Sequence, residues 1–100
     1  MAYYASVNVF AVREEDWESF VSLQDDAFVP LLRGQAGFKG FELVRTGPAT
    51  GVATIWWASE QARVAATPAL HAWVSVHLDP YFVSLDNPAG PVILTTREQA

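Results

Sequence analysis

The spacing of hydrophobic and polar residues in the first third of the chain predicts one strand followed by one long helix. Tyr3–Val12 contains two alternating rows that are both largely apolar, which indicates a strand buried on both faces. The apolar residues then change to a helical period, and acidic residues fall in what would be the first turn. We expect a helix from about residue 14 to about residue 32, with Pro30 perturbing its last turns and Gly34 ending it in a left-handed conformation.

The middle of the chain predicts an antiparallel hairpin. Its strands are Gly37–Arg45 and Val52–Trp57, which are rich in aromatic and β-branched residues. The short segment Thr46–Gly51 between them is rich in turn residues, and such a loop joins antiparallel strands. Trp56 and Trp57 must point to opposite faces of their strand, so one is expected under the helices and the other toward a dimer partner or a cavity.

A second helix is predicted after the hairpin. Ser59 is a favourable N-cap residue, and the helix is expected to extend from Glu60 to about Ala66. Thr67-Pro68 is expected to interrupt it, because proline lacks the backbone N–H that a helix interior requires. The helical pattern then resumes over residues 69–77.

The end of the chain predicts a loop over residues 86–91 and a final strand over Val92–Thr96. The resulting order β-α-β-β-α-β predicts an α+β, ferredoxin-like fold: a four-stranded antiparallel sheet with helices on one face. We expect residues 1–100 to form a single domain. The helices can cover only one face of the first strand, so its second apolar face needs another cover, and a homodimer that pairs two sheets provides one.

The composition of the chain shows an excess of apolar residues. Hydrophobic residues make up 51% of the 100 residues and charged residues 17%, compared with about 45–50% and about 25% in ordinary domains. In so short a chain this excess indicates an interface, a ligand cavity or both.

Charge and cysteine content exclude several classes of function. Six Lys and Arg against eleven Asp and Glu give a net charge of −5, which argues against nucleic acid or an anionic membrane as a partner. The absence of Cys excludes thiolate catalysis and a Cys-ligated metal. The chain has no apolar run long enough to span a membrane and no signal-peptide pattern at its start, so we expect a cytoplasmic protein.

Four segments carry a pattern of motifs that covers nearly the whole chain. They are the opening strand with Asn8, Gly37-Phe38-Lys39-Gly40-Phe41-Glu42-Leu43, Thr54-Ile55-Trp56-Trp57-Ala58-Ser59-Glu60-Gln61-Ala62 and Thr67-Pro68-Ala69-Leu70-His71. In their order and spacing these segments resemble the antibiotic biosynthesis monooxygenase family of the dimeric α+β barrel superfamily. Ala36 departs from that pattern, since it stands where the family usually has a proline.

The resemblance implies a homodimer with its sheets packed face to face and a hydrophobic pocket between sheet and helices in each protomer. It implies, for some members, oxidation of polyketide-like aromatic substrates by molecular oxygen without metal, flavin or haem. One branch of the family binds and degrades haem, using an Asn on the first strand, a Trp on the second helix and an axial His. Here Val64-Ala65-Ala66 stands where that Trp would be, which argues against haem degradation.

Three polar residues are candidates for catalysis. Asn8 matches the pocket Asn of the haem-degrading branch, and Asn is uncommon in strands, so its side chain needs a partner or a function. His71 and His77 are candidates for a proton-abstracting base or an axial ligand. They are six residues apart and do not share one helical face, so we expect no metal site. A hydrogen-bonded structural role explains each of the three residues as well.

Four aromatic residues are candidates for binding a flat apolar substrate, namely Trp57, Trp73, Tyr81 and Phe82. Packing in the core is the alternative explanation for each of them. Arg45 and Arg97 are candidates for holding an anionic substrate, and ordinary surface positions explain them equally.

The most concrete hypothesis is a homodimeric, cofactor-independent monooxygenase that acts on a hydrophobic, aromatic small molecule. Two alternatives stay open: a dimer that binds a small molecule without turning it over, and a protein that binds or degrades haem. The residues do not decide whether the chain is an enzyme.

Overall fold

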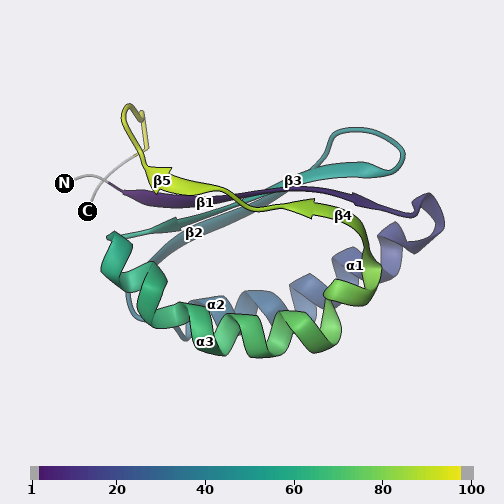
Figure 1. Ribbon diagram of the computed structural model, residues 1–100, viewed down its shortest axis with the longest axis horizontal. Helices are drawn as coiled ribbons and strands as arrows, with labels where there is room; N and C mark the ends of the chain where they lie inside the picture. The colour runs from purple at the N-terminus through teal and green to yellow at the C-terminus, as the bar shows by residue number, and fades with distance from the viewer. Residues whose placement is uncertain (1–2, 98–100) are drawn as a thin grey trace.

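The computed structural model describes residues 3–97 and has two layers (Figure 1). One layer is an antiparallel sheet, and the other consists of helices that lie along one of its faces. The strands are β1 (Tyr4–Val12), β2 (Phe38–Arg45), β3 (Thr50–Trp57), β4 (Phe82–Asp86) and β5 (Ala89–Pro91). The strand order β2-β3-β1-β4, with the antiparallel β2–β3 hairpin, confirms the predicted α+β, ferredoxin-like fold.

The final strand expected at Val92–Thr96 is wrong, because an earlier segment occupies the edge of the sheet. β4 pairs with the second half of β1, and β5 pairs with its first half. Between them, the Pro88 carbonyl accepts a hydrogen bond from the Val7 N–H at 2.8 Å. Proline is tolerated here because an edge strand does not need every N–H for pairing. The loop expected at residues 86–91 is therefore largely part of an interrupted edge strand.

The helix expected at residues 14–32 forms as four joined segments. They are the 3₁₀ turn η1 (Glu14–Asp16), α1 (Trp17–Leu23), the π-helical turn η2 (Gln24–Phe28) and α2 (Val29–Arg33). Pro30 cannot donate to the Asp26 carbonyl four residues earlier, which favours the wider turn at this point. The buried side chains are Trp17, Phe20, Gln24, Phe28 and Leu32. From Phe20 onward these residues are spaced by four, which exceeds the 3.6 residues of an α-helical turn, and the π turn keeps them facing the sheet.

The left-handed residue expected at Gly34 lies three residues later. Gly34 ends α2 with a φ of −78°, whereas Gly37 has a φ of +81°. A Cβ atom added to Gly37 would lie 2.5 Å from the Cβ of Ala62. Both the backbone conformation and the close approach of this turn to the helix that contains Ala62 therefore require glycine.

The second helix, α3 (Glu60–His77), is continuous, so the interruption expected at Thr67-Pro68 is wrong. Ser59 caps it as predicted, with its hydroxyl accepting from the Ala62 N–H at 3.1 Å. Pro68 lies on the exposed side of the helix, while Ala66 and Leu70 on either side of it pack against the core. This packing holds the helix together across the missing hydrogen bond, and the 3₁₀ turn η3 (Asp79–Tyr81) follows its end.

The two faces of the sheet differ in what covers them. Trp57 points toward the helices and is 1% exposed, whereas Trp56 points to the opposite face. On that face the Arg97 guanidinium lies 4.0 Å from the centre of the Trp56 ring. The prediction that Trp56 and Trp57 point to opposite faces of the sheet is therefore confirmed. Val9 and Val44 are half exposed on the face that has no helices.

Candidate functional site

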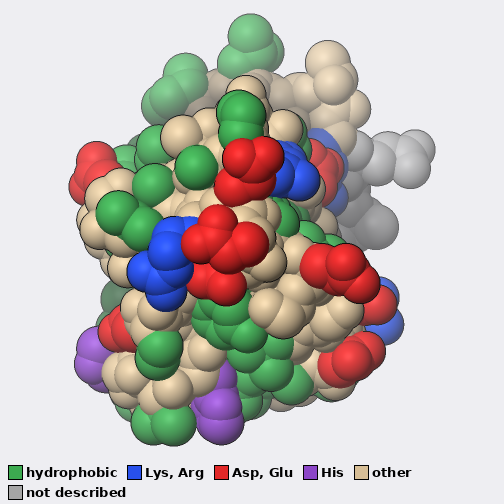
Figure 2. All heavy atoms as spheres, turned by 90° about the vertical axis from the view of Figure 1, so that its right-hand side faces the viewer, with side chains coloured by type: hydrophobic (Ala, Val, Ile, Leu, Met, Phe, Trp, Pro, Cys, Tyr) green, Lys and Arg blue, Asp and Glu red, His purple; other side chains and the backbone are tan. Residues whose placement is uncertain are grey.

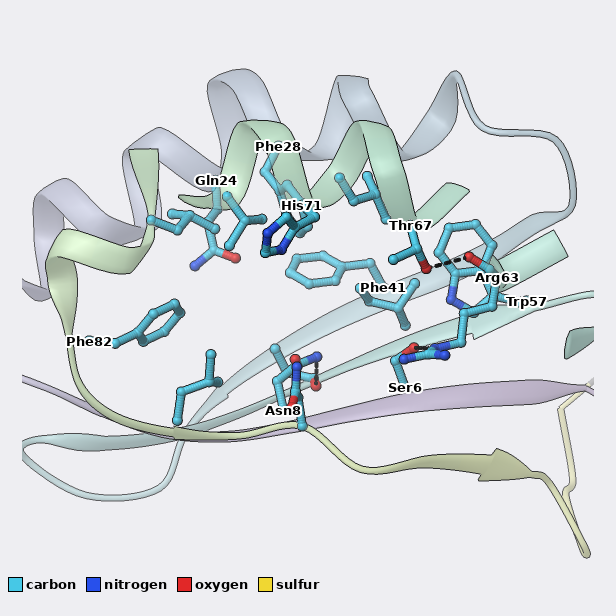
Figure 3. A pocket seen from close by; sticks show the side chains of 17 residues that line it. Ser6, Asn8, Gln24, Phe28, Phe41, Trp57, Arg63, Thr67, His71 and Phe82 are labelled. Carbon is cyan, nitrogen blue, oxygen red and sulfur yellow. Dashed lines mark hydrogen bonds between the residues drawn. The ribbon is translucent and has the colours of Figure 1, made fainter. Parts of the chain in front are cut away.

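A cavity of about 180 Å³ lies between the sheet and the helical layer. Its floor consists of residues from β1, β2 and β3, and its walls come from η2, α3 and the start of β4 (Figure 3). The apolar part of the lining includes Phe28, Phe41, Ile55, Leu70, Val74 and Phe82. The cavity also contains several polar side chains, which lie at separate places along it.

One end of the cavity carries a guanidinium group. Arg63, in the first turns of α3, donates from Nε to the Oγ of Ser6 on β1 at 3.0 Å. Figure 3 shows this pair beside Trp57, whose indole N–H is buried and has no hydrogen-bond acceptor. Thr67 follows one helical turn after Arg63 and also lines the cavity. This end of the cavity is therefore rich in hydrogen-bond donors.

Asn8 lies on the floor of the cavity, near its middle (Figure 3). Its side-chain Nδ2 donates to the Ala53 carbonyl of the neighbouring strand at 3.1 Å, which fixes the amide against the sheet. An amide nitrogen carries two N–H groups, so the second remains able to donate to a bound molecule. The Ala53 carbonyl is the hydrogen-bond partner that an Asn in a strand was expected to need. The second N–H of the amide is still able to act on a bound molecule.

His71 lines the cavity from α3, two turns after Arg63 and on the same helical face. The residue is exposed, so it lies where the cavity meets solvent. Within residues 3–97 no side chain or backbone group makes a hydrogen bond with the imidazole. Its position allows it to exchange protons with both solvent and a bound molecule.

The other candidates lie outside this lining. His77 packs on Trp73 with 4.8 Å between ring centres, and Trp73 in turn stacks on Phe28 at 5.4 Å. The hydroxyl of Tyr81 donates to Ser19 Oγ at 3.2 Å. The structure therefore brings Asn8, Trp57, His71 and Phe82 together around the cavity. It does not bring His77, Trp73 or Tyr81 into contact with that space.

The two arginines suggested by the sequence are also elsewhere. Arg45 lies over the ring of Trp17, with 4.9 Å between the guanidinium carbon and the ring centre. Arg97 lies on the open face of the sheet. The cavity arginine is Arg63, which sequence reasoning missed because an arginine in the first turns of a helix gives no distinctive pattern.

Gln24 is the second residue that sequence reasoning missed. It is 4% exposed and lines the cavity from the first position of the π turn. Its Nε2 is buried without an acceptor, and Figure 3 shows the amide directed from the helical layer into the space above the sheet. The signal that could have revealed it is its polarity four residues after Phe20 and four before Phe28, on the apolar stripe of the helix.

The cavity differs in charge from the rest of the molecule. Figure 2 shows acidic side chains spread over the end of the molecule that lies on the right of Figure 1. In the described part of the chain, no Asp or Glu lines the cavity, and no carboxylate pairs with Arg63. The site is thus locally cationic in a chain whose net charge is −5.

Two further findings concern the described residues only. Across positions 3–97, no group of three or more His, Asp or Glu side chains is placed to hold a metal ion. None of the helices in this range has the length and apolar character needed to cross a bilayer.

The fold is shared with solved structures of known proteins, although no family model and no curated protein matches the chain significantly. SnoaB, a cofactor-independent oxygenase from Streptomyces nogalater, is similar with a TM-score of 0.75 and 20% identity, over 96% of this chain and 98% of SnoaB. MhuD, a heme-degrader from Mycobacterium tuberculosis, has a TM-score of 0.74 and 18% identity, over 94% and 99%. A dimeric ferredoxin-like protein from an uncultured marine organism has a TM-score of 0.77 and 13% identity, over 96% and 100%. The resemblance expected from the sequence is therefore confirmed at the level of the fold.

Proposed function

We propose that this chain forms a homodimer and that each cavity binds a small hydrophobic aromatic molecule and oxidises it with molecular oxygen, without a cofactor. The observation that carries the proposal is the cavity itself, where an apolar lining lies around Asn8 and Trp57 and His71 lies at the side that meets solvent. SnoaB, which has the same fold, is a cofactor-independent oxygenase, and this supports the same class of reaction here.

The chemistry requires a substrate that ionises readily, such as a hydroxylated aromatic ring. His71 takes the proton, and the free N–H of Asn8 donates to the oxygen on which negative charge develops. The ionised ring gives electrons to oxygen and forms a carbon–oxygen bond. The resulting peroxide takes back the proton from His71. Its O–O bond and the C–H bond at the same carbon then break with loss of water, which leaves a carbonyl, so that one oxygen atom enters the product and the other leaves as water. The apolar lining keeps bulk water away from the anion.

The size of the cavity limits the substrate. An apolar cavity of about 150 Å³ is large enough to hold benzene. At about 180 Å³, this one holds one aromatic ring with its substituents, and any further ring would extend past His71 into solvent. The proposal therefore concerns one- or two-ring molecules.

The residues present do not fit haem, the group that the other branch of the resembled family uses. The cavity of about 180 Å³ lies below the roughly 300–1,000 Å³ of pockets that hold drug-sized ligands, and haem is larger than such a ligand. His77, one of the two candidates for the axial ligand, packs on Trp73 instead of lining the cavity. Haem binding is therefore not part of the proposal.

Binding without turnover is the second candidate, and one observation favours it. A catalytic histidine is usually oriented by a hydrogen bond to its second ring nitrogen. His71 has no such bond within the described residues, so it would have to be oriented by the substrate.

The homodimer is supported by the apolar residues on the open face of the sheet. Val9 and Val44 on that face are 48% and 50% exposed. Ile93 and Leu94, just beyond β5, are 89% and 91% exposed. Exposed apolar surface of this kind is typical of an interface.

Oxygen consumption tests the function directly. Purified protein is mixed with dihydroxynaphthalenes, and the rate is followed with an oxygen electrode. We expect turnover in the wild type, with kcat lowered about 100-fold or more in His71→Gln and reduced in Asn8→Ala. His77→Gln is the matched histidine outside the cavity and should retain the wild-type rate. Binding of these molecules without oxygen uptake would favour the second candidate, and activity that is indifferent to both His71 and Asn8 would refute the proposed mechanism.

A further inference from the structure

We propose that the cavity selects an anionic aromatic molecule that also carries a neutral hydrogen-bond acceptor at its opposite end. In this arrangement Arg63 binds the anion and Gln24 donates to the neutral acceptor. The inference names the substrate class of the proposed function and rests on the same cavity, but its test measures binding alone.

The cationic end of the cavity provides the first argument. Arg63 is partly buried, and its Nε is already used by Ser6 at 3.0 Å. This bond leaves the two Nη nitrogens to donate, and no carboxylate in residues 3–97 neutralises them. Partial removal of a guanidinium from water is costly unless the group is paired. A carboxylate on the ligand would pair with it through two parallel hydrogen bonds, and a phenolate would accept from it at a single oxygen.

Two buried donors without acceptors provide the second argument. The Trp57 indole N–H is buried beside Arg63, and the Gln24 Nε2 is buried at the other end of the cavity (Figure 3). Buried polar groups in native structures almost always have a partner, so unpaired donors on residues that line a cavity point to acceptors on its occupant. Both residues are more than nine-tenths buried, and both line this cavity.

The position of Gln24 provides the third argument. It begins the π turn, and such turns occur often at functional sites. Leucine or phenylalanine at this position would continue the apolar stripe made by Phe20 and Phe28. A polar amide on that stripe costs stability, which is expected when the residue acts on a ligand.

The unpaired donors and the apolar lining together define the molecule that the cavity would bind. Its anionic group lies between Arg63 and the Trp57 N–H, and its aromatic ring lies among the apolar lining above Asn8. A carbonyl or ether oxygen at the far end accepts from Gln24. The absence of any carboxylate from the described lining keeps the cavity free of repulsion toward such an anion.

Three small probes test both ends of the cavity. They are 4-acetylbenzoate, which has the anion and the ketone; 4-acetylbenzamide, which lacks the charge; and 4-ethylbenzoate, which lacks the ketone. Dissociation constants are measured by titration calorimetry in oxygen-free buffer. We expect the wild type to bind 4-acetylbenzoate at least about tenfold more tightly than either of the other two.

Each variant should remove one preference only. Arg63→Gln should abolish the preference for benzoate over benzamide, Arg63→Lys should keep most of it, and the exposed Arg33→Gln should keep all of it. Gln24→Leu should abolish the preference for acetyl over ethyl, whereas the exposed Gln61→Leu should not. Thermal unfolding of every variant shows that a lost preference does not reflect a lost fold.

The results separate this inference from the proposed function. The inference is overturned if none of the probes binds, if the wild type binds the benzamide as tightly as the benzoate, or if Arg63→Gln leaves the charge preference intact. Gln24→Leu with an unchanged preference for the ketone overturns the assignment of the neutral end. Selective binding of the anion without oxygen uptake would refute the oxygenase and leave the inference standing. Oxygen uptake without the charge preference would support the oxygenase and refute the inference.

Discussion

Arg63 on α3 donates from its Nε to the Oγ of Ser6 on β1 at 3.0 Å, and this bond joins the helical layer to the sheet at one end of the cavity. The two residues are 57 positions apart in the sequence. Ser6 is buried at 9% exposure, so the bond holds the guanidinium at a fixed depth. The orientation of the charged end of the site therefore depends on one neutral hydroxyl.

Removing that hydroxyl should weaken binding of an anion without eliminating it. Ser6→Ala leaves the charge of Arg63 in place but frees its side chain, so we expect the dissociation constant for 4-acetylbenzoate to rise by about two- to tenfold. The exposed Ser22→Ala on α1 provides the control and should change nothing. A loss in Ser6→Ala as large as that in Arg63→Gln would mean that Ser6 itself contacts the anion.

Replacing the orphaned amide should stabilise the free protein. Gln24→Leu removes a buried donor that has no acceptor and extends the apolar stripe, so the free energy of unfolding in urea should rise by about 1–2 kcal/mol. The same variant should bind 4-acetylbenzoate more weakly, which would separate binding from stability. A lower free energy of unfolding would show that the amide is already satisfied in the free protein.

The turn before β2 should tolerate only glycine at its left-handed position. Gly37→Ala combines a φ of +81° with a Cβ 2.5 Å from that of Ala62. We expect a loss of about 2 kcal/mol or more in the free energy of unfolding. Gly90→Ala is the matched control, because a Cβ there meets no atom within 4 Å. Equal effects of the two substitutions would contradict the structure of this turn.

Pro68, inside α3, should lower the free energy of unfolding of the protein. Pro68→Ala restores an N–H that can donate to the Val64 carbonyl and removes the steric clash of the ring, so we expect a gain of about 1–3 kcal/mol. Pro80→Ala, at the start of η3, where proline is well tolerated, should give no gain. Urea denaturation measures both variants. A destabilised Pro68→Ala would indicate that the continuous helix depends on the rigid ring.

The proposed dimer should dissociate when charge is placed on the open face of the sheet. Light scattering should give the wild type twice the 11.0 kDa mass of one chain. Val9→Asp should give the single-chain mass, because the interface would have to bury its carboxylate. Val64→Asp, at an exposed position on α3, should remain dimeric. A wild-type protein that is monomeric at micromolar concentration would refute the dimer.

Local signals in the sequence determined most of the fold. The apolar rows of Tyr3–Val12, the turn residues between β2 and β3, and the cap at Ser59 each predicted an element that the structure contains. These features work over a few residues, where the period of side chains and the chemistry of turns are decisive. The ferredoxin-like order followed from the sequence of elements alone.

The sequence-based errors occurred where pairing or packing overrode a local signal. Pro68 predicts a helix break, but Ala66 and Leu70 pack on the core at either side of it. Val92–Thr96 has the composition of a strand, yet the edge of β1 is already occupied by β4 and β5. A residue pattern cannot show which of two apolar segments pairs with the edge of the sheet.

For the site, the sequence by itself determined the candidates: Asn8 because Asn is uncommon in strands, the two histidines because of their acid–base chemistry, and four aromatic residues because they could wall a flat pocket. Only the tertiary structure decided which of these residues lie together around the cavity. It separated His71 from His77 by the direction each takes from α3, and it added Gln24 and Arg63, whose types are ordinary in helices. A cavity is formed by side chains from strands and helices far apart in the chain, so its lining, its charge and its unpaired donors appear only when those elements are packed together.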